Sequence, residues 1–304
     1  ASYGQDGSTY GIYAQRYDAA GTAVGAEFKV NSTTSNEQTE PHVATFGDGS
    51  FVVVWRSYLQ DGDSYGIYAQ RFSAAGLATG SEFRVNTTTA SAQYEEQVAA
   101  LEGGGFVVVW RSEDQDGSNA GVYAQRYQAD GSPAGGEFRV NVSTLGGQYQ
   151  PDISALANGG FAVTWYNDNY DVSGTGSYAD VYVREFAADG TPLTGQVKVN
   201  TPNGSTSQYE PTIAHIGSDN YVIAWRSDAQ DGSNSGIYQQ LMGTATELAR
   251  SEAPTLGDFG GSVSFGENLV NASPQLLDPV VSFTDLDSPS MAGGLVTVFY
   301  VSGA

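Results

Sequence analysis

Phe51-Val-Val-Val-Trp55 returns three times along the chain, as Phe106-Val-Val-Val-Trp110, Phe161-Ala-Val-Thr-Trp165 and Tyr221-Val-Ile-Ala-Trp225. The four tryptophans are 55, 55 and 60 residues apart. A run that is apolar at successive positions is typical of a strand covered on both faces. A fixed period of this length indicates a repeat architecture, in which each unit buries its faces against its neighbours.

Three other segments recur at fixed places in each repeat and complete a four-stranded unit. Pro41-His-Val-Ala-Thr-Phe46 precedes the valine run, and Gly47-Asp48-Gly49 joins the two with the positive φ angles of a tight hairpin. Gly66-Ile-Tyr-Ala-Gln-Arg-Phe72 and Glu82-Phe-Arg-Val-Asn86 follow the valine run. The pattern therefore predicts four antiparallel strands in each unit.

A four-stranded sheet whose middle strand is buried on both faces needs a neighbouring sheet on each side. Radial repetition supplies these neighbours, so the sequence predicts an all-β fold: a β-propeller of four-stranded antiparallel blades, about 55 residues per repeat and about five blades or more. A β-solenoid is the alternative, although its coils are usually shorter. The propeller is predicted over residues 1–250, with units near 1–31, 41–86, 96–141, 150–200 and 210–250. Because the chain begins inside a unit, we expect its natural start to lie upstream.

The chain is strongly acidic: 12 Lys and Arg residues stand against 34 Asp and Glu residues, which gives a net charge of −22. Nucleic acids and anionic membranes are bound through basic surface, so neither is an expected partner. The chain has no cysteine, which excludes disulfides and thiolate metal sites. No apolar run approaches the roughly 20 residues that span a bilayer, so membrane insertion is not expected.

Residues 251–304 depart from the repeat. They contain in order Glu267-Asn268, Leu277-Asp-Pro279, Phe283-Thr-Asp-Leu-Asp-Ser288 and Gly294-Leu-Val-Thr-Val298. This series resembles the opening of the cadherin-like domains of large bacterial surface proteins. The resemblance implies the beginning of a cadherin-like or Ig-like β-sandwich, truncated before such a domain would be complete.

The repeat region resembles, over residues 1 to about 248, repeats of giant secreted proteins called RTX-type or hemolysin-type calcium-binding proteins. Its motifs Gln-Asp-Gly-Ser and Gly-Ile-Tyr-Ala-Gln-Arg-Phe support the resemblance. The Gly-Gly-x-Gly-x-Asp nonapeptide that binds calcium in RTX rolls does not occur, so that motif implies no calcium site here. The resemblance implies a secreted, extracellular or cell-surface protein.

Carboxylates in two regions are candidate calcium ligands, because calcium takes six to eight oxygens on a compact turn. The loops between second and third strands contain Asp61, Asp63, Asp114, Asp116, Asp228 and Asp231. The cadherin-like segment contains Glu267, Asp285 and Asp287, which would repel one another without a cation. The alternative for the loops is that each Asp accepts N–H bonds within its own turn or pairs with the preceding arginine, Arg56, Arg111 or Arg226.

Other recurring residues have plainer interpretations. A tryptophan that ends an apolar strand is usually core, so Trp55 and its three equivalents are predicted to be buried. Tyrosines such as Tyr94, Tyr149 and Tyr209 are open to a sugar-binding role. Arg71 and Glu82, which recur together on adjoining strands, are predicted to form a cross-strand ion pair.

No catalytic residue is predicted, since His42 and His215 lie at different positions of the unit and no Ser/His/Asp order recurs. The sequence is therefore interpreted as a non-enzymatic, calcium-stabilised surface module for adhesion or matrix building. Expected partners are other surface proteins, glycans or copies of itself. Two alternatives remain open: a lectin-like propeller with repeated polar-aromatic pockets, and a structural subunit of an extracellular sheath. Hydrolysis by paired carboxylates is the remaining enzymatic possibility.

Overall fold

The computed structural model describes residues 1–168, 178–201, 206–217, 220–230, 232, 234–243, 255–256 and 283–284. The chain divides into two compact units, Ala1–Thr244 and Ala245–Ala304. In the second unit the described residues form one antiparallel pair, β20 (Thr255–Leu256) and β21 (Phe283–Thr284). The cadherin-like prediction falls otherwise outside the described residues.

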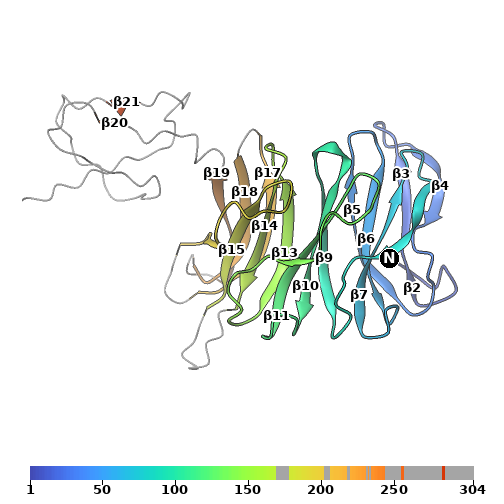
Figure 1. The fold of residues 1–304 in the computed structure, drawn as a ribbon, viewed down its shortest axis with the longest axis horizontal. Coiled ribbons are helices and arrows are strands. Elements are labelled where there is room, and N and C mark those ends of the chain that lie inside the picture. The colour runs from blue at the N-terminus through green and yellow to red at the C-terminus, as the bar shows by residue number, and fades with distance from the viewer. Residues whose placement is uncertain are drawn as a thin grey trace, which may run out of the picture. The chain divides into compact units, whose positions relative to one another are not determined.

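The first unit is a series of antiparallel sheets, which we call blades 1 to 5 (Figure 1). Blade 1 contains β1 (Ser2–Tyr3), β2 (Tyr10–Gly11), β3 (Tyr13–Tyr17) and β4 (Ala23–Lys29). Blade 2 contains β5 (Gln38–Thr45), β6 (Phe51–Tyr58), β7 (Tyr65–Phe72) and β8 (Ala78–Arg84). Blade 3 contains β9 (Gln93–Ala100), β10 (Phe106–Glu113), β11 (Ala120–Tyr127) and β12 (Phe138–Arg139).

The later blades repeat this plan. Blade 4 contains β13 (Gln148–Ala155), β14 (Phe161–Asn167), β15 (Asp180–Phe186) and β16 (Val197–Lys198). Blade 5 contains β17 (Gln208–His215), β18 (Asn220–Asp228) and β19 (Ser235–Gly243). The one described helix is the 3-10 turn Glu102–Gly104 between β9 and β10. The prediction of an all-β propeller with four-stranded antiparallel blades is confirmed.

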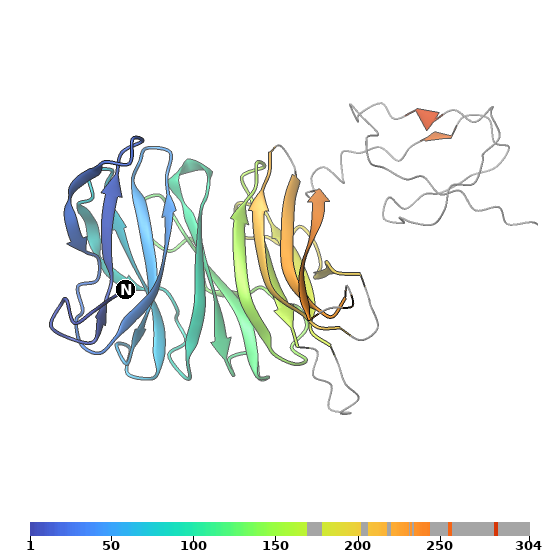
Figure 2. The same ribbon diagram turned by 180° about the vertical axis from the view of Figure 1, so that it is seen from behind.

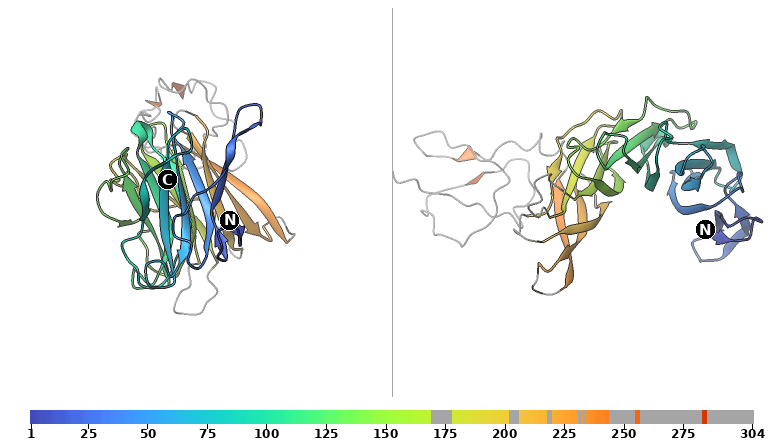
Figure 3. Two further views of the ribbon diagram at one scale, coloured as in Figure 1. Left: turned by 90° about the vertical axis from the view of Figure 1, so that its right-hand side faces the viewer. Right: turned by 90° about the horizontal axis from the view of Figure 1, so that it is seen from below.

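The blades of the first unit follow one another around an arc (Figure 3) and stand face to face (Figure 2). Their first strands contact one another in order, β5 with β9, β9 with β13 and β13 with β17. The fourth strands β8, β12 and β16 form the opposite edge of each sheet. The first strands therefore line the inner side of the arc.

The core lies between consecutive blades. Val52 and Val54 of blade 2 pack against Phe106, Val108 and Trp110 of blade 3, and the same pattern recurs at the other blade junctions. Each such side chain contributes about 1.5–3 kcal/mol when fully buried. Trp55, Trp110 and Trp165 are 0% exposed and Trp225 is 5% exposed, which confirms the prediction of core tryptophans.

A buried pair of side-chain amides, which we call the polar latch, joins blades 1, 2 and 3 each to the blade that follows. Asn86, which follows β8, accepts a hydrogen bond from the Ile67 N–H at 2.7 Å and donates to the Gln93 side chain at 2.9 Å. Asn31 and Gln38, and Asn141 and Gln148, make the same bond across their own junctions at 3.0 and 2.8 Å. The amide pair thus ties the end of one blade to the first strand of the following blade.

The recurring arginine and glutamate also bind neighbouring blades rather than each other. The Glu82 carboxylate accepts hydrogen bonds from the N–H and hydroxyl of Ser32 in the preceding blade, at 2.6 and 3.0 Å. The Arg71 guanidinium donates to the carbonyl oxygen of Ala129 in the following blade. The predicted Arg71–Glu82 ion pair is therefore wrong, because a blade junction offers each side chain backbone groups that need partners.

Candidate functional site

An irregularity repeats in the first strand of blades 2 to 5. The pairing between first and second strands shifts register at a β-bulge, between Tyr149 and Asp152 for example. Each bulge holds a non-glycine residue at positive φ; these residues are Glu40 (51°), Glu95 (57°), Gln150 (49°) and Glu210 (53°). A bulge redirects a side chain, and a left-handed non-glycine residue stores backbone strain that is common at functional sites.

Each bulge residue lies beside the end of the second strand of its own blade. The Glu40 carboxylate is 2.6 Å from the Arg56 guanidinium, and Glu210 is 2.9 Å from Arg226. In blade 3 the Arg111 guanidinium contacts Glu95 at 3.2 Å. Blade 4 has Tyr166 and Gln150 at these two positions.

Tyrosines join these pairs into one continuous stack, which we call the polar row. It comprises Arg56, Arg111, Tyr166 and Arg226 from the second strands, Glu40, Glu95, Gln150 and Glu210 from the bulges, and Tyr94, Tyr149 and Tyr209 beside the bulges. The Arg111 guanidinium carbon is 5.3 Å from the Tyr94 ring centroid and 4.6 Å from that of Tyr149. The Tyr166 ring lies 5.3 Å from Tyr149 and 5.2 Å from Tyr209.

The stacking determines which groups the row offers to a ligand. Guanidinium and tyrosine neighbours lie against Tyr94, Tyr149 and Tyr209, so the row presents hydroxyl, guanidinium and carboxyl groups between closely spaced rings. Every one of these tyrosines is half-buried. Burial, together with the nearby Glu95, raises the pKa of Tyr166 to about 12, so its hydroxyl remains a hydrogen-bond donor at neutral pH.

The row forms a pocket between blades 2, 3 and 4. Its volume is about 510 Å³, and its lining residues are Glu40, Arg56, Tyr94, Glu95, Arg111, Glu113 and Gln150. Arg111 also contacts Glu113, and although burial alone would lower its pKa, the Glu95 and Glu113 carboxylates raise it. The pocket thus holds three carboxylates and two guanidinium groups in alternation.

A buried acid lies behind this pocket. Glu96 is 0% exposed, and neither oxygen of its carboxyl group makes a hydrogen bond of normal geometry. Burial raises its pKa well above the ordinary value, although the nearby Arg56 and backbone N–H groups oppose the shift. Pro41, Pro151 and Pro211 occupy the equivalent position of the other blades, so this departure from the repeat is the sequence signal that could have identified Glu96.

The aspartates predicted as calcium ligands in the loops bind their own turns and neighbouring strands. Asp116 accepts from the Ser118 N–H at 3.0 Å and the Asn141 side chain at 3.4 Å, and Asp61 contacts Asn86 in the same way at 3.5 Å. These contacts match the alternative in which the repeated Asp organises its turn.

The remaining predicted ligands that the structure describes accept hydrogen bonds from serines. Asp63 accepts from the Ser91 N–H at 3.1 Å, Asp114 from the Ser91 hydroxyl at 3.4 Å, and Asp228 from the Ser235 hydroxyl at 2.9 Å. In the part of the chain that the structure describes, no three His, Cys, Asp or Glu side chains are placed to hold one metal ion. Asp231, Glu267, Asp285 and Asp287 lie outside the described residues. Calcium binding by the loop aspartates stays a prediction.

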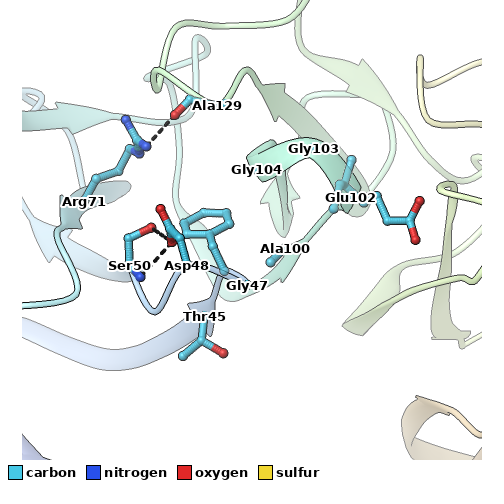
Figure 4. A pocket seen from close by; sticks show the side chains of 12 residues that line it. Thr45, Gly47, Asp48, Ser50, Arg71, Ala100, Glu102, Gly103, Gly104 and Ala129 are labelled. Atoms are coloured by element: carbon cyan, nitrogen blue, oxygen red, sulfur yellow. Dashed lines mark hydrogen bonds between the residues drawn. The ribbon is translucent and has the colours of Figure 1, made fainter.

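A larger groove of about 790 Å³ lies between the hairpin turns of blades 2 and 3, at the other end of the first strands (Figure 4). Two of its charged side chains have local partners, and a third points elsewhere. Asp48 accepts from Ser50 at 2.5 Å, Arg71 donates to Ala129, and Glu102 points away from both. In the polar row, by contrast, carboxylates, guanidinium groups and a tyrosine from neighbouring blades converge on one pocket. Among the described residues no helix is long and apolar enough to cross a membrane.

Comparison with known proteins yields similarity in structure alone. No protein-family model and no curated protein sequence matches the chain. Among solved structures, an α-L-arabinanase of Penicillium chrysogenum complexed with arabinobiose is 13% identical, with a TM-score of 0.50, 67% of this chain covered and 62% of that chain. An α-L-arabinofuranosidase of Fusarium graminearum is 13% identical, with a TM-score of 0.48, 68% of this chain and 63% of that chain covered. An endo-arabinase of Bacteroides thetaiotaomicron is 13% identical, with a TM-score of 0.41, 68% and 73% covered.

The comparison corrects two sequence-based interpretations. The chain spans less than two thirds of the length of the first two enzymes, and at this identity the likeness concerns the fold. The arabinanase is neither a repeat of an RTX-type calcium-binding protein nor a cadherin-like adhesin, and no family model supports that assignment, so the assignment is wrong. The short motifs that suggested it, such as Gln-Asp-Gly, have the turn roles described above. The interpretation as a non-enzymatic adhesion module is corrected by the same finding, and what the chain has in common with the arabinanase is its fold.

Proposed function

We propose that the polar row binds carbohydrate, with the pocket around Tyr94 as its main subsite. The observation that carries this proposal is the alternation of carboxylates, guanidinium groups and a tyrosine in one pocket of about 510 Å³. Sugar hydroxyl groups both donate and accept hydrogen bonds, and this lining supplies acceptors and donors side by side. The proposal is nearest to the alternative of a lectin-like propeller, for which polar-aromatic pockets are expected.

A further observation supports the proposal. The arabinanase that resembles this fold was solved with arabinobiose bound, so a related architecture holds a sugar. We propose an extracellular site of action, where the net charge of −22 would keep the chain soluble.

A second candidate function is cleavage of the bound glycan. Glycosidases pair one carboxylic acid held protonated with a second carboxylate that stays ionised. Burial raises the pKa of Glu96 well above its ordinary value, whereas Glu40 is paired with Arg56 within the same region. Release of reducing ends from a neutral polysaccharide, abolished in Glu96→Gln and Glu40→Gln with binding retained, would support cleavage. Binding without any turnover would leave carbohydrate binding alone.

Binding is tested by calorimetric titration with soluble arabinan, xylan and mannan. Tyr94→Ala should lower the affinity for glycan by at least about tenfold, because it removes the ring that lies between Arg56 and Arg111. Tyr17→Ala is the matched control, because this tyrosine is 65% exposed on blade 1, outside the row, and should leave affinity unchanged. Equal loss in both variants, or no binding by the wild-type chain to any of the three glycans, would contradict the proposal.

A further inference from the structure

Each arginine of the polar row is paired with the carboxylate of the bulge in its own blade. In blades 2 to 5 the bulge residue and the second-strand residue are 16 positions apart in the sequence. In blades 2, 3 and 5 the bulge residue is Glu and the second-strand residue is Arg. Blade 4 differs at both positions at once: Gln150 replaces the acid and Tyr166 replaces the base. Each pair therefore has no net charge in a chain whose overall charge is −22.

No arginine of the row is left without a carboxylate. Arg56 is 2.6 Å from Glu40, and Arg226 is 2.9 Å from Glu210 and 3.5 Å from Asp228. Sites that recognise carboxylates or phosphates offer a guanidinium free to form a bidentate pair. An anionic sugar would here have to displace a carboxylate that belongs to the protein, against the repulsion of the remaining acids.

Arg111 shows the same arrangement more strongly. Its guanidinium contacts Glu95 at 3.2 Å and also contacts Glu113. The second oxygen of Glu95 accepts the backbone N–H of Gln150 in the next blade at 2.6 Å. This carboxylate is fixed on both sides, so the pairing is part of the architecture of the row.

The row is also continuous over four blades. Adjacent planar groups from Tyr65, through Arg56, to Arg226 lie 4.6–5.6 Å apart without a gap. A single sugar fills one pocket of this row, whereas a chain of sugars can use the hydroxyl and guanidinium edges of successive blades. Adjacent subsites multiply affinity because the second contact is made within one complex.

We propose that the ligand of the polar row is an uncharged, extended glycan chain that runs across several blades. This inference rests on the proposed carbohydrate binding and specifies its ligand class. Neutral sugar hydroxyls take the place of water on paired groups without breaking the ion pairs.

The test compares glycans that differ only in charge or only in length. Galacturonan in its acid form and in its fully methyl-esterified form isolates charge, and arabinan oligosaccharides of two and six sugars isolate length. In affinity electrophoresis at physiological salt the wild-type chain should be retarded by neutral arabinan and not by the acid galacturonan. Affinity should rise at least about tenfold from the two-sugar to the six-sugar ligand.

A matched pair of variants probes the charge balance itself. Glu40→Gln frees the Arg56 guanidinium and should create retardation by the acid galacturonan. Adding Arg56→Tyr reproduces the pair of blade 4 and should remove it again, while thermal melts confirm that both variants fold. Binding of the acid form in preference to the esterified form and to neutral arabinan, or equal affinity for two and six sugars, would overturn the inference and leave carbohydrate binding intact. If no glycan binds, the proposed function fails as well.

Discussion

At the scale of single residues, Glu96 is the clearest departure from the repeat. Three blades have proline at this position, and blade 3 buries a carboxyl group there without hydrogen bonds of normal geometry. Its pKa in the folded chain is raised above the ordinary value of 4.5. The unfolded chain therefore releases this proton at lower pH, so the contribution of Glu96 to stability falls as pH rises above about 4.5 towards the raised pKa.

Replacing Glu96 by proline should stabilise the protein, and more so at alkaline pH. The position already accepts proline in the other blades, and Glu96 lies in the gap that the bulge leaves in the strand pairing. We expect the free energy of unfolding to rise by about 1–3 kcal/mol at pH 8 and by much less at pH 4. Urea unfolding at both pH values measures the difference, and an equal effect at the two would disprove the role of ionisation.

At the scale of elements, the strands could be predicted from sequence and the bulges could not. Phe106-Val-Val-Val-Trp110 identifies a strand buried on both faces, because its composition alone requires burial. A bulge depends on one residue at positive φ, such as Glu95, which nothing in a strand-like sequence requires. The candidate site was missed for this reason, although Tyr94 and its equivalents were recognised as open to sugar binding.

The polar latch at the first three blade junctions gives an element-scale prediction. Asn86→Ala removes the acceptor of the Ile67 N–H and a partner of Gln93, both of which are buried. Loss of stability should be about 2–4 kcal/mol, because two polar groups remain unsatisfied. Gln128→Ala, on an exposed side chain, is the control and should change stability by less than about 0.5 kcal/mol. A cost at Asn86 no greater than the control would refute the latch.

At the scale of the whole molecule, the repeat period was sufficient to predict the architecture but not the function. Radial stacking follows from a 55-residue unit with a buried middle strand. Function depends on side chains that converge from different blades, as Arg56, Tyr94 and Glu95 do in the pocket. Short motifs such as Gln-Asp-Gly suggested a calcium-binding adhesin, but their aspartates serve turns that this fold needs in any case.

The central claim is that carbohydrate occupies the polar row, and hydrogen exchange with and without a saturating neutral polysaccharide tests it most directly. Backbone amides around Tyr94–Glu95 and Tyr149–Gln150 should exchange more slowly in the presence of glycan. The hairpin turn around Glu102, at the other end of β9, should exchange at an unchanged rate. Protection of that turn with no change at the two bulges would place the ligand elsewhere and contradict the account.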